Sequence, residues 1–324
     1  MVGLLRLRRG FSSRVWLSSA ELYATEAAPR RQASGAGRKD AAVWSANRMP
    51  CYNPAFMARQ RLGQHFLRTG WPVQIARAIR VSPPALERVE KSPYCWIEIG
   101  AGHGEMTEHL AATGAPVYAV ELDPPLIARL QQLTAKFSNL TVLPGDVLKT
   151  DLPAIAAGRR IKLYGNLPYY ITSPILHHFF ESAERIDEIH VVIQAEVAFR
   201  LVARPGTRDY GYLSVLTQCF SRPAIALKLP PEAFQPPPEV GSALVSMKLP
   251  GENARLELQD SSKFLEFVKL CFAQKRKTLV NNLRGTFETE KTKHALAEMK
   301  LGTSARAEEL SVAQLAATFR ALAL

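Results

Sequence analysis

The chain has 324 residues, of which 47% are hydrophobic, and it carries a formal net charge of +12. This length and composition are enough for one large folded domain and a smaller one, and no run approaches the ~18 apolar residues of a membrane-spanning helix. Four widely spaced cysteines form no zinc-binding or disulfide pattern, so we expect no metal site, and the basic balance favours a polyanionic partner rather than a membrane.

Residues 1–57 differ from the rest of the chain. They contain nine Lys and Arg against three Asp and Glu, which is half of the net charge, and they show no sustained helix or strand pattern. We interpret this segment as a disordered leader or extension, because the sequence from Met57 is typical of a bacterial start. The alternative is a mitochondrial presequence, since basic residues alternate with Leu and Phe near the N-terminus. The first interpretation predicts a cytoplasmic protein and the second a protein of the mitochondrial matrix.

From residue 94 onward, short apolar runs alternate with segments of helical pattern. Strands are predicted at 94–100, 116–123, 140–146, 161–166 and 188–194. Helices are predicted near 105–113, 124–136, 173–183 and 196–202. Strands that alternate with helices at this spacing predict a mostly parallel, doubly wound α/β sheet. Two further strands, 223–230 and 241–249, are separated only by a proline-rich loop and are expected to pair antiparallel.

The pattern changes after Pro250. Segments 262–285 and 311–324 place apolar residues close to the period of a helix. We therefore expect a larger catalytic domain over 58–250 and a small helical domain over 251–324. The sequence "QKRKTLVNNLR" is expected to form a basic helix within the second of these domains.

Three glycines at alternate positions follow the first predicted strand. Gly100, Gly102 and Gly104 precede the next predicted helix, where glycine lets the backbone turn tightly and approach a ligand. Dinucleotide-binding loops usually read GxGxxG, with the helix N-terminus facing a pyrophosphate. Here the third glycine comes one residue early and Glu98 lies in the strand before the loop. This form suits S-adenosylmethionine, which has no phosphate, so we expect Gly100 and Gly102 to contact that cofactor.

Acidic residues end the next two predicted strands. Glu121 ends the second strand, where a carboxylate can accept hydrogen bonds from both ribose hydroxyls of an adenosine. Asp146 ends the third, where it can accept from the exocyclic amine of the cofactor's adenine. Ligands of such sheets bind beyond the carboxyl ends of the strands, so we expect the glycine loop and both acids to converge there.

The fourth predicted strand ends in the sequence NLPY. An exocyclic adenine amine is a poor nucleophile, because its lone pair is delocalised into the ring. The side-chain oxygen of Asn166 and the backbone carbonyl of Leu167 can accept from both N–H groups and favour a pyramidal, attacking nitrogen. Pro168 stiffens the turn, and Tyr169 offers a ring face on which an extruded base can stack. Proximity to a reactive methyl group supplies much of the rest, without a metal or a strong base.

Eight motifs occur in order between Gln60 and Leu283: "QRLGQHFL", "IEIGAGHGEMTEHL", "VELD", "GDVLKTD", "GNLPYYITSPIL", "RPGTRDYGYLSV", "FQPPPEVGSALV" and "QKRKTLVNNL". Together they resemble the family of small-subunit ribosomal RNA adenine-N6,N6 dimethyltransferases, over nearly everything after Met57. The resemblance implies a Rossmann-like class I S-adenosylmethionine methyltransferase sheet and a small C-terminal helical domain. It also implies two methyl transfers to each of two adjacent adenosines near the 3′ end of small-subunit (16S-type) rRNA, with a role in small-subunit biogenesis.

The resemblance also implies roles for single residues. Cofactor contacts fall on His65, Leu67, Gly100, Glu121, Asp146 and Asn166, and His65 stands where many relatives have Asn. Phe234 becomes a second aromatic that flanks the target base with Tyr169. The basic residues that would contact RNA phosphates, without reading sequence, are Lys275, Arg276 and Lys277. The implied partner is small-subunit rRNA in a pre-30S-type particle, bound by a monomer.

Three other functions compete with this interpretation. The large-subunit rRNA adenine methyltransferases of antibiotic resistance share the fold, but they tend to carry NIPY where this chain has NLPY. A non-catalytic mitochondrial nucleic-acid-binding factor of the same fold gains weight if residues 1–57 are a presequence, although the glycine loop, both acids and NLPY are intact. A nicotinamide-dependent dehydrogenase is disfavoured by the glycine spacing and by the lack of a hydride-transfer constellation.

Overall fold

The computed structural model describes residues 64–81, 92–256, 258 and 260–323. The two interpretations of residues 1–57 therefore fall outside the described residues. All described residues belong to one unit of mutual contacts that spans 53–324. Within this described part, no helix is both long enough and apolar enough to cross a membrane.

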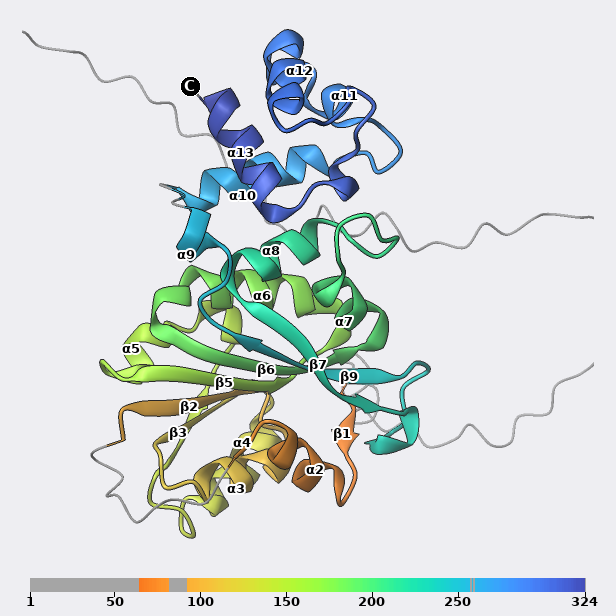
Figure 1. The fold of residues 1–324 in the computed structure, drawn as a ribbon. Helices are drawn as coiled ribbons and strands as arrows, with labels where there is room; N and C mark the ends of the chain where they lie inside the picture. The colour runs from red at the N-terminus through yellow and green to blue at the C-terminus, as the bar shows by residue number, and fades with distance from the viewer. Residues whose placement is uncertain (1–63, 82–91, 257, 259, 324) are drawn as a thin grey trace, which may run out of the picture. The chain divides into compact units, whose positions relative to one another are not determined.

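Seven strands form the main sheet, in the order β4-β3-β2-β5-β6-β9-β7 (Figure 1). In chain order their bounds are β2 (Tyr94–Ile99), β3 (Val117–Glu121), β4 (Leu140–Pro144), β5 (Arg160–Asn166), β6 (Ile186–Gln194), β7 (Arg222–Leu229) and β9 (Ser242–Lys248). The strands from β4 to β6 are parallel, and β9 and β7 add an antiparallel pair at one edge. The predicted doubly wound sheet and its antiparallel pair are confirmed. Because the strand order reverses between β2 and β5, a crevice forms at their carboxyl ends.

Helices cover both faces of this sheet (Figure 1). On one face lie α5 (Leu152–Ala156), α6 (Thr172–Glu181) and α7 (Ala195–Val202). On the other lie α2 (Trp71–Ala78), α3 (Glu105–Ala111) and α4 (Pro124–Leu133). Alternating side chains of β2 serve the two faces: Cys95 and Ile97 join the core under the first set, and Trp96 joins the core under the second. The near-continuous apolar strands in the sequence follow from this two-sided burial.

The C-terminal residues form a group of helices that contacts α8 (Tyr212–Phe220) through α9, α10 and α13, and α8 is a helix that the sequence pattern did not reveal. These helices are α9 (Asn253–Leu256), α10 (Ser261–Cys271), α11 (Leu279–Leu283), α12 (Thr289–Glu298) and α13 (Val312–Ala323). Both α10 and α13 contact α8 (Figure 1). Buried Phe264 and Leu315 belong to the same apolar cluster as the sheet core. The helical character of the C-terminal region is confirmed, whereas the domain boundary at residue 250 stays a prediction.

The predicted basic helix is wrong in one respect. Lys275, Arg276 and Lys277 lie in an exposed turn between α10 and α11, not in a helix. The Nδ2 atom of Asn282 donates to the carbonyl of Cys271 at 2.7 Å, which satisfies the end of α10. Thr278 then caps α11 by accepting from the backbone N–H of Asn281 at 3.3 Å. These two side chains end α10 and begin α11 within a stretch of sequence whose apolar residues follow one continuous helical period.

A short second sheet joins the start of the described chain to a late segment. Strand β1 (Phe66–Leu67) pairs antiparallel with β8 (Phe234–Gln235), so that Leu67 lies opposite Phe234. Sequence patterns cannot reveal pairs of two residues, and neither strand was predicted. This pairing matters because it carries residues 64–66 to the carboxyl ends of β2 and β5.

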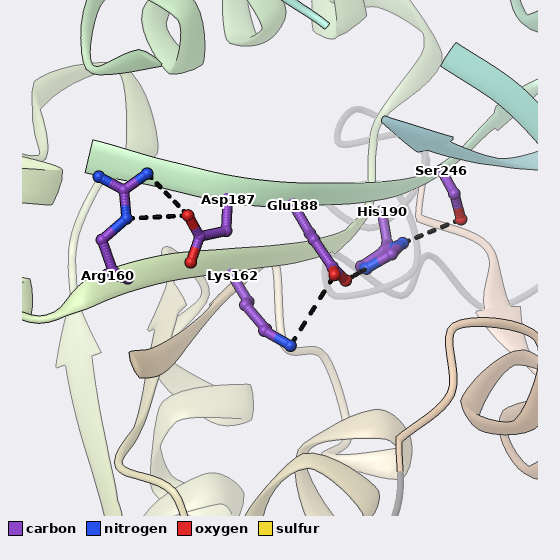
Figure 2. A network of polar contacts seen from close by, with 6 residues as sticks. All are labelled: Arg160, Lys162, Asp187, Glu188, His190 and Ser246. Atoms are coloured by element: carbon purple, nitrogen blue, oxygen red, sulfur yellow. Dashed lines mark hydrogen bonds and ion pairs between the residues drawn. The ribbon is translucent and has the colours of Figure 1, made fainter. Parts of the chain in front are cut away.

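A polar network crosses the sheet near the amino ends of β5 and β6 (Figure 2). His190 is 2% exposed, and its two ring nitrogens contact Glu188 at 3.0 Å and Ser246 at 2.9 Å. The hydrogen bond from His190 lowers the pKa of Glu188, although burial opposes this, and nearby Lys162, at 3.9 Å, lowers it further. Because every partner lies on the sheet, this histidine has a structural role and links β6 to β9.

Candidate active site

A cavity opens at the carboxyl ends of the parallel strands, where the strand order reverses. The loops after β2, β3, β4 and β5 form its wall, together with the segment around β1. The predicted residues in its lining are His65, Gly100, Gly102, Glu121, Asp146, Asn166, Leu167, Pro168 and Tyr169. The loops converge as expected, whereas the roles assigned to single residues stay predictions.

The glycine loop depends on backbone conformations that other residues rarely adopt. Gly102 has φ +60°, and a Cβ atom there would lie 3.2 Å from the ring of Phe66. Gly104 has φ +90°, and its Cβ would lie 2.5 Å from Cδ1 of Leu133 in α4. Gly102 therefore lets the β1 segment approach the loop, and Gly104 lets α3 begin directly against α4.

Glu98 lies beneath this loop rather than in the cavity lining. It is 2% exposed and accepts a hydrogen bond from the Thr107 hydroxyl of α3 at 2.5 Å. Burial raises the pKa of Glu98 to about 8, with Thr107 opposing the rise and the charges of Glu105 and Glu121 adding to it. This side chain therefore joins β2 to α3 under the loop.

Backbone N–H groups hold the carboxylate of Glu121. Its Oε2 accepts from Gly102 at 2.9 Å, and its Oε1 accepts from Leu122 at 2.8 Å and Asp123 at 3.0 Å. A carboxylate offers about four acceptor positions, so these three bonds leave about one for a ribose hydroxyl. The sequence predicts a contact to both ribose hydroxyls. For that, one of the three backbone N–H groups would have to share its acceptor position on Glu121 with a hydroxyl.

Asp146 presents its carboxylate where β4 ends. Its Oδ1 accepts from the backbone N–H of Leu148 at 3.0 Å and caps the following short turn at 147–149. The cap fixes the position of this acid in the cavity wall, where β3 separates its strand from the strand that precedes the glycine loop.

Two contacts fix the orientation of the NLPY turn. The Nδ2 atom of Asn166 donates to the backbone carbonyl of His65 at 2.7 Å, so Oδ1 is the end of the amide that remains to accept from a substrate. The N–H of Leu167 donates to the carbonyl of Val192 at 3.0 Å, which continues the pairing of β5 with β6. A Cβ on Gly165 would lie 2.8 Å from Cδ2 of Leu167 and 3.2 Å from the backbone carbonyl oxygen of Ile99, so a glycine just before Asn166 lets the neighbouring strand approach closely.

Two contacts hold the side chain of Tyr169, one at its hydroxyl and one at its ring. Its hydroxyl contacts the Ser242 hydroxyl at 2.7 Å, and its ring stacks on the His65 imidazole with centroids 5.6 Å apart and planes at 24°. Burial raises the pKa of Tyr169, although the hydrogen bond to Ser242 opposes the rise. The phenol therefore acts here as an anchored neutral ring rather than as a proton acceptor.

Two of the residues predicted to contact the cofactor or the target base lie outside the cavity lining. Leu67 is 8% exposed and Phe234 is 1% exposed, and both belong to the apolar core under α2 and α3. The ring of Phe234 packs within the core, and its role as a second ring beside the target base stays a prediction. Leu67 bears on the cavity through its backbone pairing in the β1–β8 sheet, because its side chain is buried in the core.

The basic residues of the C-terminal region lie apart from the cavity lining. Lys275 donates from Nζ to the backbone carbonyl of Arg208 at 2.7 Å, so the basic turn lies against the loop between α7 and α8. Arg276 and Lys277 are exposed beside it.

The cavity also includes residues that sequence reasoning missed. Gln64 and Phe66 enter through the unpredicted β1 segment, Leu122 follows Glu121, and Tyr170 follows Tyr169. Tyr170 is 61% exposed and Leu122 is 57% exposed, which is unusual for side chains of their size. The sequence signal that could have identified Tyr170 is the second of the two tyrosines that follow NLP. Among the described residues, no group of His, Cys, Asp and Glu could hold a metal ion.

A family model described as ribosomal RNA adenine dimethylase matches residues 55–324. The ribosomal RNA small subunit methyltransferase A of Acidobacterium capsulatum is 43% identical over 228 residues, which cover 70% of this chain and 80% of that protein. The protein of the same name from Moorella thermoacetica is 37% identical over 275 residues, which cover 82% of this chain and 92% of that protein.

Two solved structures share the fold. A dimethyladenosine transferase from Plasmodium falciparum superposes with a TM-score of 0.66 at 22% identity, over 78% of this chain and 96% of that one. The 23S rRNA methyltransferase ErmE superposes with a TM-score of 0.59 at 25% identity, over 80% of this chain and 100% of that one. The main sheet and its helices are therefore those of a Rossmann-like methyltransferase.

Proposed function

The chain belongs to the ribosomal RNA adenine dimethylase family, and from this premise we propose how its cavity carries out the reaction. The protein is an S-adenosylmethionine-dependent enzyme that dimethylates adenine N6 in small-subunit ribosomal RNA. The observation that carries the mechanism is the amide of Asn166, held by a backbone carbonyl so that its oxygen remains to accept from the substrate.

The residues of the cavity fit the cofactor. The loop at Gly100 and Gly102 admits a ligand close to the backbone, Glu121 has an acceptor position left for a ribose hydroxyl, and Asp146 stands at the next strand end. When bound, S-adenosylmethionine supplies an electrophilic methyl group attached to a positively charged sulfur. The enzyme's own part is then to place the adenine amine in line with that methyl group.

Asn166 and Leu167 prepare the amine. The Asn166 Oδ1 and the Leu167 carbonyl accept from the two N–H groups, so the nitrogen lone pair is drawn out of the ring and toward the methyl carbon. With the cofactor bound, these two acceptors would hold the amine in line with the methyl group, and the methylated amine would give its extra proton to water. In a second round, one N–H would remain to be held in the same way.

Tyr169 holds the extruded base. Its anchored ring offers a face for stacking in the same lining as Asn166, and a flipped base can stack on such a face whatever its identity. Tyr170, 61% exposed in the same lining, offers a second ring to the neighbouring nucleotide at the mouth of the cavity. Sequence-independent affinity comes from the exposed basic turn at Lys275, Arg276 and Lys277.

The natural substrate that we propose is an assembling small subunit, a pre-30S-type particle, bound by one copy of the enzyme. The two target adenosines are adjacent and lie near the 3′ end of the RNA, and methylation accompanies subunit biogenesis. The named relatives are bacterial, which supports a cytoplasmic enzyme over the mitochondrial alternative. The large-subunit and non-catalytic alternatives are not favoured, because the named relatives are small-subunit enzymes and the NLPY turn is intact.

The test is methyl transfer from labelled S-adenosylmethionine to under-methylated small subunits, with large-subunit RNA assayed in parallel and the product nucleoside identified. We expect dimethyladenosine in small-subunit RNA alone. Label in the large-subunit RNA would favour the resistance-type activity, and RNA binding without any label would favour the non-catalytic factor.

A further inference from the structure

We infer that His65 is a positioning residue for the base-binding half of the site: its imidazole fixes the ring of Tyr169 for stacking. This inference rests on the proposed adenine methylation. It differs from the cofactor contact that the family resemblance implies, because its main effect falls on the target base. Three segments that are far apart in the sequence meet at this one residue.

The first contact is made by the backbone. The His65 carbonyl accepts from Nδ2 of Asn166 at 2.7 Å and so selects which end of that amide faces the substrate. Any amino acid at position 65 could supply this carbonyl, provided that the β1 segment keeps its place. The contact therefore explains why the segment is needed, but not why the residue is histidine.

The side chain makes the other two contacts. Nδ1 lies 2.9 Å from the backbone carbonyl of Pro236, and because a carbonyl can only accept, Nδ1 carries a proton. The imidazole is thereby tethered to the proline-rich loop at 236–238. In this position its ring stacks on Tyr169, with centroids 5.6 Å apart and planes at 24°. Asparagine at this place could reach a carbonyl but has no ring to stack.

The consequence concerns the two faces of Tyr169. The imidazole lies against one face, with ring centroids 5.6 Å apart, and Ser242 contacts the hydroxyl at 2.7 Å, so the ring is held at two points. In our inference the target adenine stacks on the face that the imidazole leaves free, within the cavity lining that Tyr169 shares with Asn166. Phe234, expected from the sequence to flank the base, is 1% exposed in the core, and the imidazole is the second ring that the structure places beside Tyr169.

The experiment compares three substitutions at this position in the full-length enzyme: His65→Phe, His65→Asn and His65→Ala. For each we would measure the single-turnover rate on under-methylated small subunits at saturating S-adenosylmethionine, and the cofactor Kd by calorimetry. His294→Asn, on a side chain 75% exposed in α12, is the matched control for the chemical change. Thermal unfolding of each variant checks that the fold is kept.

We expect His65→Phe to retain most of the single-turnover rate, because phenylalanine keeps a stacked ring. His65→Asn and His65→Ala should lose about tenfold, the scale of an aromatic pair. The cofactor Kd should stay within about twofold in all three, since the contacts of His65 are to Tyr169, Asn166 and Pro236.

Two outcomes would overturn the inference. If His65→Asn keeps the rate while His65→Phe loses it, the polar contact rather than the ring matters. If the cofactor Kd rises in step with the loss of rate, His65 is a cofactor ligand. Failure of the proposed function is separate from both, because it would appear as absence of dimethyladenosine with the wild-type enzyme.

Discussion

At the scale of single residues, Asn166 depends on a backbone carbonyl that comes from more than a hundred positions earlier in the chain. Replacing it by alanine removes the acceptor for the adenine amine but leaves the basic turn and the glycine loop in place. We expect Asn166→Ala to lower the single-turnover methylation rate by about a hundredfold or more, the scale for loss of one group that stabilises a transition state. RNA affinity, measured by filter binding, should change little; near-wild-type turnover would contradict the mechanism.

Glu98 gives a prediction about pH at the same scale. Because burial raises its folded pKa to about 8, above the unfolded value of 4.5, the unfolded chain ionises first as pH rises. The folded state should therefore lose stability between about pH 5 and 8 through this group. Glu98→Gln, which stays neutral, should flatten that decline.

Denaturant unfolding at a series of pH values measures the effect. Glu108→Gln, on the exposed side of α3 where the carboxylate pairs with Lys136 at 2.8 Å, is the matched control. Unfolding curves of Glu98→Gln and wild type that differ by the same amount at every pH would show that Glu98 is ionised in the folded protein.

The sequence predicted which side chains lie in the cavity, but not the groups to which they hydrogen-bond. Glu121 and Asn166 could be assigned to the cavity because the carboxyl ends of parallel strands meet at one edge. Their hydrogen bonds to Gly102 and to the His65 carbonyl depend on loop conformation and on a two-residue strand pair, neither of which leaves a periodic signal.

At the scale of elements, the junction of the glycine loop with α3 and α4 can be tested with a matched pair of glycines. Gly104 has φ +90° and Gly285 has φ +94°, but a Cβ on Gly104 would lie 2.5 Å from Leu133 whereas a Cβ on Gly285 meets nothing within 4 Å. Alanine at Gly285 should cost about 1 kcal/mol from backbone strain alone. Alanine at Gly104 should cost a further 1–3 kcal/mol or so from overpacking.

Urea unfolding of the two variants makes the comparison. Equal losses of unfolding free energy would mean that α4 moves aside at no cost, and the close approach of α3 and α4 would then not need glycine at that position.

Helices and strands long enough to show a hydrophobic pattern could be predicted from the sequence, whereas shorter ones could not. The strands from β2 to β6 are long apolar runs, and α3 and α4 carry clear start signals. Strands β1 and β8 have two residues each, and the break between α10 and α11 is made by the side chains of Asn282 and Thr278. The Thr278 cap is local and the Asn282 contact reaches back to Cys271, but both lie within a continuous helical period that conceals the break.

At the scale of the whole molecule, the net charge of +12 is expected to act through particular surfaces. Replacing Lys275, Arg276 and Lys277 by glutamine should weaken RNA binding and reduce its dependence on salt, by about one unit of slope for each phosphate that these side chains no longer neutralise. Lys136→Gln, on a side chain 63% exposed in the turn after α4, tests whether charge alone matters. An unchanged slope in the triple variant would mean that the basic turn is merely solvated.

The pairing of His65 with Pro236, 171 positions later, has a consequence for how the enzyme is made. During synthesis the β1 segment emerges early, but its partner strand β8 follows only after six of the seven strands of the main sheet. A nascent chain that already contains the glycine loop, Glu121 and NLPY therefore still lacks the contact that holds the β1 segment in the site. Completion of the active site is thus a late event in translation, and methylating competence arrives only when almost the whole catalytic sequence has left the ribosome that makes it.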